Sequence, residues 1–180
     1  YHTAQNFKDD FKVIYGCEAY LVDDLFDTVL NSEGQSLQGS FVVFDLETTG
    51  FSATRNRIIE FGAVKVENGS ITDRFSTFVN PQVPIPLRIT EVTSITNDMV
   101  KDAPTIETVL PEFLEFCKGC VLVAHNSEFD YTFIQKKSKE QNLEAEFTVV
   151  DTVGIARVLF PHLAKYTLDN VAKVLKIEYL

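Results

Sequence analysis

The chain has 180 residues, of which 45% are hydrophobic and 23% are charged, and its formal net charge is −10. This composition is typical of one globular domain with a hydrophobic core, and it excludes a wholly disordered chain. The sequence has no run of about 18 apolar residues and no signal-peptide pattern, so we expect no membrane span and a cytoplasmic protein. The negative charge argues against a broad basic surface for nucleic acid, but an anionic substrate held through divalent metal ions remains possible.

The first 38 residues differ in pattern from the rest of the chain. Residues 17–30 predict a loose connector or a single turn, and residues 31–40 are rich in Ser, Gly and Gln without any period, which is typical of a linker. We therefore place a domain boundary near Gly39. Residues 1–38 are expected to form an N-terminal fragment with its linker, and residues 39–180 the main domain.

Three strands are expected at the start of the main domain. Residues 41–44 are a continuous apolar run, which predicts a central strand covered on both faces. Residues 57–66 and 70–80 are β-rich and flank Asn68-Gly69, a dipeptide that predicts a hairpin. The prolines at positions 81, 84 and 86 make the next stretch extended.

Helices and short strands alternate in the second half of the chain. Helices are expected from Pro104 to residue 117, and over residues 128–142, 152–160 and 166–176, with short strands over residues 121–125 and 147–151. The predicted fold class is therefore α/β: a mixed sheet, with an antiparallel three-strand meander plus parallel strands, flanked by helices. This order of elements is that of the ribonuclease H-like arrangement.

Several of the predicted strands run out into acidic residues. Asp45 and Glu47 follow the first strand, and residues two apart on an extended chain point to the same side. Two such carboxylates raise each other's pKa unless a cation lies between them, which points to a divalent metal. Asp130 and Asp151 follow later strands, where an acid can equally be a turn former or a helix N-cap.

These residues together resemble the motifs of a known family. Residues 45–50, Asp-Leu-Glu-Thr-Thr-Gly, resemble the first motif, D-x-E-T-T-G, of the DnaQ-like (DEDD) 3′–5′ exonucleases, and residues 125–130, His-Asn-Ser-Glu-Phe-Asp, resemble their second, H-N-x-x-F-D. Residues 59–64 are similar to the family's I-E-x-G-A-V strand, and Asp151-Thr152 to its D-T. The resemblance covers residues 41–180, with four motifs in the family's order.

The resemblance implies two-metal hydrolysis of the 3′-terminal phosphodiester, which releases nucleoside 5′-monophosphates. Asp45, Glu47 and Asp130 would be the catalytic metal ligands, and their hard oxygens suit two Mg²⁺ or Mn²⁺ ions. Five further residues would bind the terminal nucleotide, although ordinary packing or turn chemistry could equally explain them: Thr48, Thr49, Ile95, Asn126 and Phe129.

The N-terminal fragment implies a narrower context. Residues 12–24 resemble a segment of the PHP domain of bacterial PolC-type replicative DNA polymerases, in which a proofreading exonuclease is inserted. The implied partners are a single-stranded or frayed DNA 3′ terminus, the polymerase and PHP parts of a parent chain, and the replisome.

The family's third motif, a His or Tyr general base followed by a fourth Asp, is not found, since neither His162 nor Tyr166 has the required spacing to Asp169. We therefore expect the chain as given to be truncated before this motif and to be a poor nuclease.

Two other functions fit the same residues. RNA-trimming exonucleases share these motifs, and the sequence does not show whether a 2′ hydroxyl is recognised. A catalytically incomplete module could instead bind nucleic acid or a partner, with phosphate contacts from cations that are otherwise ordinary surface charges: Arg55, Arg57, Lys136, Lys137 and Lys139.

Overall fold

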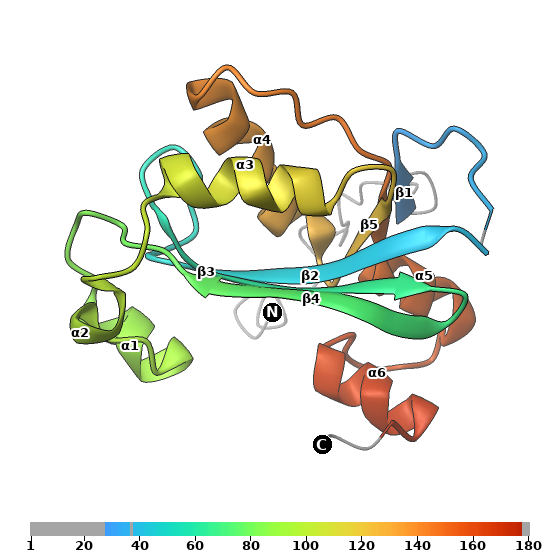
Figure 1. Cartoon of the computed structure of the whole chain (residues 1–180). Coiled ribbons are helices and arrows are strands. Elements are labelled where there is room, and N and C mark those ends of the chain that lie inside the picture. Colours follow the sequence, from blue (N-terminus) through green and yellow to red (C-terminus); the bar gives the residue numbers. More distant parts are fainter. Residues whose placement is uncertain (1–27, 37, 178–180) are drawn as a thin grey trace, which may run out of the picture.

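A six-stranded mixed sheet forms the centre of the molecule in the computed structural model, which describes residues 28–36 and 38–177 (Figure 1). The strand order is β1-β6-β5-β2-β3-β4. Strands β2, β3 and β4 form an antiparallel meander, whereas β5 pairs in parallel with both β2 and β6. This arrangement confirms the predicted mixed α/β sheet. The strands are β1 (Val29–Leu30), β2 (Ser40–Thr48), β3 (Ile58–Glu67), β4 (Ser70–Phe78), β5 (Val121–Ala124) and β6 (Val149–Asp151).

Helices lie on both sides of this sheet. In Figure 1, α3 and α4 lie above the sheet, and α6 lies below it. Among the described residues, no helix is both long enough and apolar enough to cross a membrane. The helices are α1 (Leu87–Thr93), α2 (Asn97–Val100), α3 (Ile106–Phe116), α4 (Ser127–Glu140), α5 (Thr152–Leu159) and α6 (Leu168–Leu175).

The hairpin between β3 and β4 has the predicted turn. Asn68 and Gly69 both adopt positive φ, at 51° and 75°, as the favoured two-residue hairpin turns require. The proline-containing stretch after β4 is not helical, as predicted, but it is not extended throughout, because it bends at Gln82, which has φ 57°. Pro86 then has φ −60° at the start of α1, a value compatible with helix initiation. Helices α1 and α2 were not predicted, because they are short and the only residue buried in either is Val100.

Strand β1 corrects the expectation of a loose connector before residue 31. Val29 and Leu30 pair antiparallel with Val150 and Val149 of β6, so this segment extends the sheet at its edge. A strand of two residues is too short to show a periodic pattern in the sequence, so its presence depends on pairing with the partner strand. The PHP-like segment over residues 12–24 lies outside the described residues, and the division of the chain at Gly39 stays a prediction.

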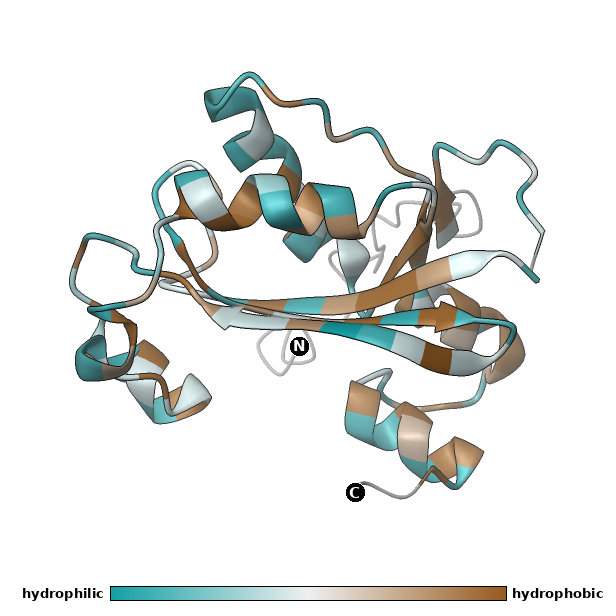
Figure 2. Cartoon of the chain, viewed as in Figure 1, coloured by the Kyte–Doolittle hydropathy of each residue, from teal (hydrophilic) through white to brown (hydrophobic). Residues whose placement is uncertain are grey.

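The main hydrophobic core lies between the sheet and helices α3 and α4. Side chains of β2 alternate, so that Val42, Phe44 and Leu46 are at most 4% exposed. The Phe113 ring from α3 lies at the centre, with centroids 5.6 Å from Phe44, 4.8 Å from Phe61 and 5.6 Å from Phe75. Figure 2 shows hydrophobic residues along the side of α3 that meets the sheet.

The other face of β2 is less covered than the apolar run suggests. Val43 is 41% exposed, so the expectation that residues 41–44 are covered on both faces is wrong at this position. Antiparallel and mixed sheets can leave part of one face in contact with solvent, and α6 covers this side only in part. The uncovered face is the one that carries the acidic residues.

Candidate active site

Three acidic residues share the open face of the β2–β3 pair. Asp45 and Glu47 alternate with the buried positions of β2, so their side chains project away from the core. Glu60 on β3 lies directly opposite Glu47 in the register, and Gly62 lies opposite Asp45. Directly opposite residues of an antiparallel pair point to the same side. The missing side chain at Gly62 leaves room beside Asp45, and Glu60 adds a third carboxylate that the predicted site did not include.

Asp130 approaches the same strand from helix α4. It lies in the first turn of α4 and is 2% exposed, and its Oδ1 accepts a hydrogen bond of 3.1 Å from the Leu46 backbone N–H. Strand β5 pairs with β2 only from Phe41 to Val43, so the Leu46 N–H has no strand partner on that side. Asp130 therefore continues the hydrogen bonding of β2 where β5 ends, and it is not the N-cap of α4, which is Asn126.

Burial raises the pKa of all four acids, and the charges of neighbouring acids add to this effect at Glu47, Glu60 and Asp130. Burial and the charges of Asp45 and Glu47 raise the pKa of Asp130 to about 7, against the opposing effect of the Leu46 N–H. Burial, followed by the charges of Asp45 and Glu60, raises the pKa of Glu47. The pKa of Glu60 is raised by burial and by Asp45. Burial also raises the pKa of Asp45, and nearby His125 partly opposes this effect.

The chemistry of these four acidic side chains suits a hard divalent cation. All four side chains offer carboxylate oxygens, which Mg²⁺ and Mn²⁺ prefer, and a cation among them would relieve the repulsion that raises their pKa values. Within residues 28–36 and 38–177, no group of three or more His, Cys, Asp or Glu side chains is gathered closely enough to hold an ion as it stands. Ion binding would thus require the carboxylates to draw together or water molecules to bridge them.

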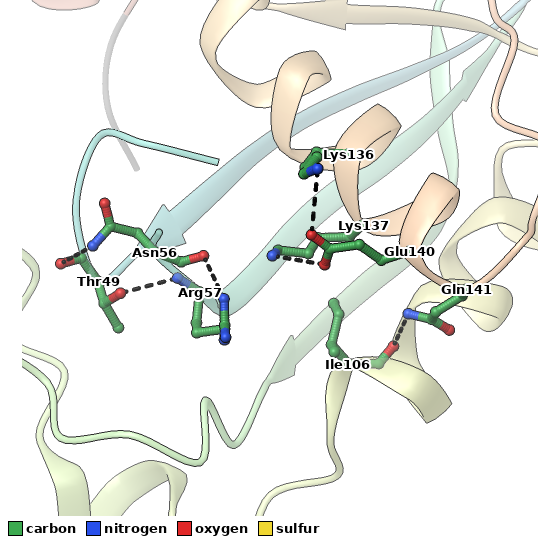
Figure 3. Close-up of polar contacts among 8 residues, drawn as sticks. All are labelled: Thr49, Asn56, Arg57, Ile106, Lys136, Lys137, Glu140 and Gln141. Atoms are coloured by element: carbon green, nitrogen blue, oxygen red, sulfur yellow. Dashed lines mark hydrogen bonds and ion pairs between the residues drawn. The ribbon is translucent and has the colours of Figure 1, made fainter. Parts of the chain in front are cut away.

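The turn after β2 is held by hydrogen bonds within itself (Figure 3). The Thr49 hydroxyl accepts a hydrogen bond of 3.0 Å from the Arg57 N–H, and the Thr49 N–H donates to the Arg57 carbonyl at 2.8 Å. The Thr48 hydroxyl donates to the Gly50 carbonyl at 2.8 Å. Both threonines are buried and both hydroxyls have partners, which is the turn chemistry that the sequence left as an alternative. Their contact with a nucleotide stays a prediction.

This turn presents an aromatic side chain that the sequence analysis missed. Phe51 is 83% exposed, and its ring meets that of Phe129 edge to face with centroids 6.2 Å apart. The two rings border a hollow of about 260 Å³. The sequence does offer one signal for this contact, since Phe51 directly follows the Thr-Thr-Gly turn of the first motif. The lining is completed by Ala53, Asn126, Glu128, Thr132 and Phe133.

The remaining predicted substrate residues fall in different environments. Asn126 lies in this hollow, in the left-handed region at φ 70°, and its N–H donates to Asp151 Oδ1 at 3.0 Å. Ile95, in contrast, is 3% exposed and packs with Ile59, Ile85 and Val100, so the structure favours the packing alternative for it.

Asp151 is the N-cap of α5. Its side chain accepts a hydrogen bond of 2.8 Å from the Val153 N–H, which confirms the capping alternative for this acid.

His125 of the second motif and Tyr166 are both hydrogen-bonded within the chain. His125 Nε2 lies 2.8 Å from the Tyr166 carbonyl, which can only accept, so Nε2 carries the proton and donates. His125 Nδ1 lies 2.9 Å from the Thr152 hydroxyl. The Tyr166 hydroxyl donates to the Phe160 carbonyl at 2.9 Å. Asp169 lies in the first turn of α6, whose N-cap is Thr167.

The lysines of α4 are mostly paired within the helix (Figure 3). Lys137 is 3% exposed and forms an ion pair of 3.0 Å with Glu140, which also lies 3.8 Å from Lys136. A buried lysine with a carboxylate partner has no surface for a phosphate group, so the alternative that Lys137 contacts phosphate is wrong.

The match to a family model identifies the class of protein as an exonuclease. Residues 42–180 match the RNase T family model, described as Exonuclease, and the chain belongs to this family. The match begins at Val42 within β2 and includes the rest of the sheet after that residue. It also includes α4 and α5, the helices that begin at the predicted motifs of residues 125–130 and 151–152. Segment 28–36, which includes β1, lies before the match.

Among its relatives are bacterial replicative polymerases. The DNA polymerase III PolC-type of Caldanaerobacter subterraneus subsp. tengcongensis is 53% identical over 169 residues, which are 94% of this chain and 12% of that protein. The protein of the same description from Clostridium perfringens is 51% identical over 171 residues, 95% of this chain and 12% of that protein. The chain thus spans 12% of the length of these relatives.

Solved structures agree on the fold. Exonuclease X in complex with 5′ overhanging duplex DNA is 30% identical with a TM-score of 0.63, and the match covers 77% of this chain and 75% of that one. Exonuclease I of E. coli in complex with a dT13 oligonucleotide has a TM-score of 0.69 at 15% identity, covering 79% of this chain and 37% of that one. The second likeness shows the fold alone.

Proposed function

We propose that this chain is the proofreading 3′–5′ exonuclease of a PolC-type replicative DNA polymerase, and that it hydrolyses the 3′-terminal phosphodiester of DNA to release nucleoside 5′-monophosphates. The observation that carries the proposal is the set of carboxylates Asp45, Glu47 and Asp130, whose pKa values are all raised at the end of one strand. The PolC-type relatives support the polymerase context, and the similarity to Exonuclease X in its complex with DNA supports the substrate.

Asp45, Glu47 and Asp130 would hold two Mg²⁺ or Mn²⁺ ions through their carboxylate oxygens. The family resemblance implies that Asp45 would serve both ions, Glu47 the ion that activates the attacking water, and Asp130 the ion that stabilises the leaving oxygen. When bound, such ions activate a water and neutralise charge at the scissile phosphate. Asp130 has a second role, because its hydrogen bond to the Leu46 N–H keeps α4 against β2. Glu60 faces the same point and would add negative charge that strengthens cation binding.

The hollow beside Phe51 and Phe129 would receive the terminal nucleotide. Two aromatic rings and the polar Asn126 offer a base both a stacking surface and a hydrogen-bonding group. Such a subsite suits a single-stranded or frayed 3′ end, since a base within a duplex is stacked on its neighbours. The polymerase and PHP parts of a parent chain, within a cytoplasmic replisome, would deliver that end.

We also expect slow cleavage by this chain alone. A water at the carboxylates must lose a proton, yet both ring nitrogens of His125 and the hydroxyl of Tyr166 already have hydrogen-bond partners. We therefore expect neither residue to accept that proton efficiently.

The test is release of mononucleotide from a 3′-labelled single-stranded DNA oligonucleotide with Mg²⁺ or Mn²⁺. We expect slow, chelator-sensitive release that is lost in Asp45→Ala and retained in Asp73→Ala, a matched change of an exposed acid on β4. A parallel RNA oligonucleotide separates the RNA-trimming alternative, which requires faster release from RNA. Binding to single strands that neither chelator nor Asp45→Ala alters, without any release, would establish a binding module instead.

A further inference from the structure

Residues 28–36 contact the exonuclease body through a defined set of interactions. The Thr148 hydroxyl donates a hydrogen bond of 2.6 Å to the Asn31 carbonyl and accepts one of 2.6 Å from Gln35 Nε2. Asn31 Nδ2 also donates to the Phe147 carbonyl at 3.0 Å. With the β1–β6 pairing, these contacts attach both ends of the segment to β6 and the residues just before it. We call residues 28–36 the clasp.

The clasp also packs closely against helix α5. A methyl group on Gly154 would lie 2.7 Å from the Thr28 Oγ1, which would have to shift, and 3.2 Å from the Thr28 Cα, which is closer than most Cβ contacts. The absence of a side chain at Gly154 therefore lets the start of the clasp approach α5. A segment that only linked two domains would need neither this approach nor the hydrogen bonds of Thr148.

Strand β6 leads directly from the clasp to the candidate active site. Asp151, the last residue of β6, accepts hydrogen bonds from the Asn126 N–H at 3.0 Å and from the Val153 N–H at 2.8 Å. Asn126 is the N-cap of α4, and Asp130 in the next turn accepts from the Leu46 N–H. A continuous series of hydrogen bonds and strand pairings thus runs from the clasp to β2.

The clasp and the helix start also form one surface. Leu30 and Asn31 line a groove of about 660 Å³ together with Asn126 and Glu128, which also line the hollow beside Phe51. The clasp therefore shares a groove with two residues of the proposed nucleotide subsite.

We propose that the clasp belongs to the exonuclease unit, and that Thr148 and Asn31 are positioning residues that act through Asp151 to fix the start of α4, and with it Asn126 and Asp130, against β2. The clasp would then move together with β6 and the start of α4, and a displacement of the clasp would reach Asp130 through β6.

Amide hydrogen exchange of the whole 180-residue chain, without metal or substrate, tests this role independently of the proposed function. Thr148→Val keeps the side-chain shape and removes both hydrogen bonds of its hydroxyl. We expect the Asn126 and Leu46 amides to exchange about tenfold faster, a change that corresponds to the loss of about one or two hydrogen bonds. Ser32→Ala, a change in the same segment of a hydroxyl whose contact is with Gly34, should leave both amides unchanged.

A double variant tests the route through Asp151. In an Asp151→Ala background the Asn126 amide has already lost its acceptor, so adding Thr148→Val should accelerate its exchange no further. If Thr148→Val accelerates exchange only at Leu30 and Val149, and leaves Asn126 and Leu46 as they were, the positioning role is overturned. If Thr148→Val does not fold, Asn31→Ala and Gln35→Ala, at exposed positions, provide the same measurement with the same two outcomes.

Discussion

The two faces of β2 differ in how their side chains are accommodated. On the α3 side, Val42, Phe44 and Leu46 are almost fully buried, and Phe113 contacts three other rings. On the other side, Val43 is 41% exposed, and the neighbouring acids Asp45 and Glu47 have raised pKa values. One strand thus supplies stability with one face and chemistry with the other, so changes on the two faces should have separable effects.

The largest loss of stability is expected from Phe113→Ala. The ring is completely buried at the centre of the aromatic cluster, and its removal leaves a cavity that should lower the free energy of unfolding by about 3–5 kcal/mol. Denaturant unfolding followed by circular dichroism measures this loss. Nuclease activity per folded molecule should stay close to that of the unaltered chain, and a selective loss of activity would contradict the separation of the two faces.

Asp130→Asn should change how stability depends on pH. The folded chain holds the Asp130 proton up to a pKa of about 7, whereas the unfolded chain releases it near the ordinary value of 3.8. The folded state thus binds more protons between these values, so the stability of the metal-free chain should fall as pH rises from about 4 to 7, by about 4 kcal/mol at most.

In Asp130→Asn this fall should become smaller, because the amide has no proton to lose and its oxygen can still accept from the Leu46 N–H. The raised pKa values of Asp45, Glu47 and Glu60 should leave part of the fall in place. Unfolding by denaturant at pH 5 and pH 8 compares the two proteins, with Asp73→Asn as the control. An unaltered pH dependence in Asp130→Asn would show that other acids cause it. Nuclease activity should be lost at both pH values.

Gly50→Ala should damage the turn between β2 and β3, which follows the strand that carries both faces. Gly50 has φ 154°, and a Cβ there would lie 2.8 Å from Nδ2 of the Asn56 side chain. We expect a loss of about 1–3 kcal/mol in the free energy of unfolding, together with weaker activity because the turn carries Phe51. Gly62→Ala is the matched control for stability, since the nearest atom to its Cβ is the Asp45 carbonyl oxygen at 4.0 Å. Equal effects of the two changes would argue against a special role of the turn.

Phe51→Ala should have the smallest effect on stability and a clear effect on substrate. The side chain is 83% exposed, so the free energy of unfolding should change by less than about 0.5 kcal/mol. If a base stacks on the ring, binding of a single-stranded oligonucleotide should weaken by about 1–3 kcal/mol, measured by fluorescence anisotropy with Ca²⁺ in place of Mg²⁺. Phe51→Trp should retain binding, and equal affinity of all three proteins would exclude the stacking role.

Much of the fold follows from local patterns in the sequence. The apolar run over residues 41–44, the Asn68-Gly69 turn and the helical periodicity of residues 106–117 each predict their element, because each pattern lies within one element. Helices α1 and α2 and strand β1 were missed for the opposite reason. They are short, they bury few side chains, and β1 exists only because β6 offers it an edge.

The candidate site divides in the same way. The sequence alone singled out Asp45, Glu47 and Asp130 as the predicted metal ligands, since they lie in motifs that end in or follow buried strands. Only the tertiary structure decided that Glu60 faces Glu47, that Ile95 and Lys137 are buried, and that Phe51 stands beside Phe129. These outcomes depend on strand register and on contacts between residues far apart in the chain, which no local pattern encodes.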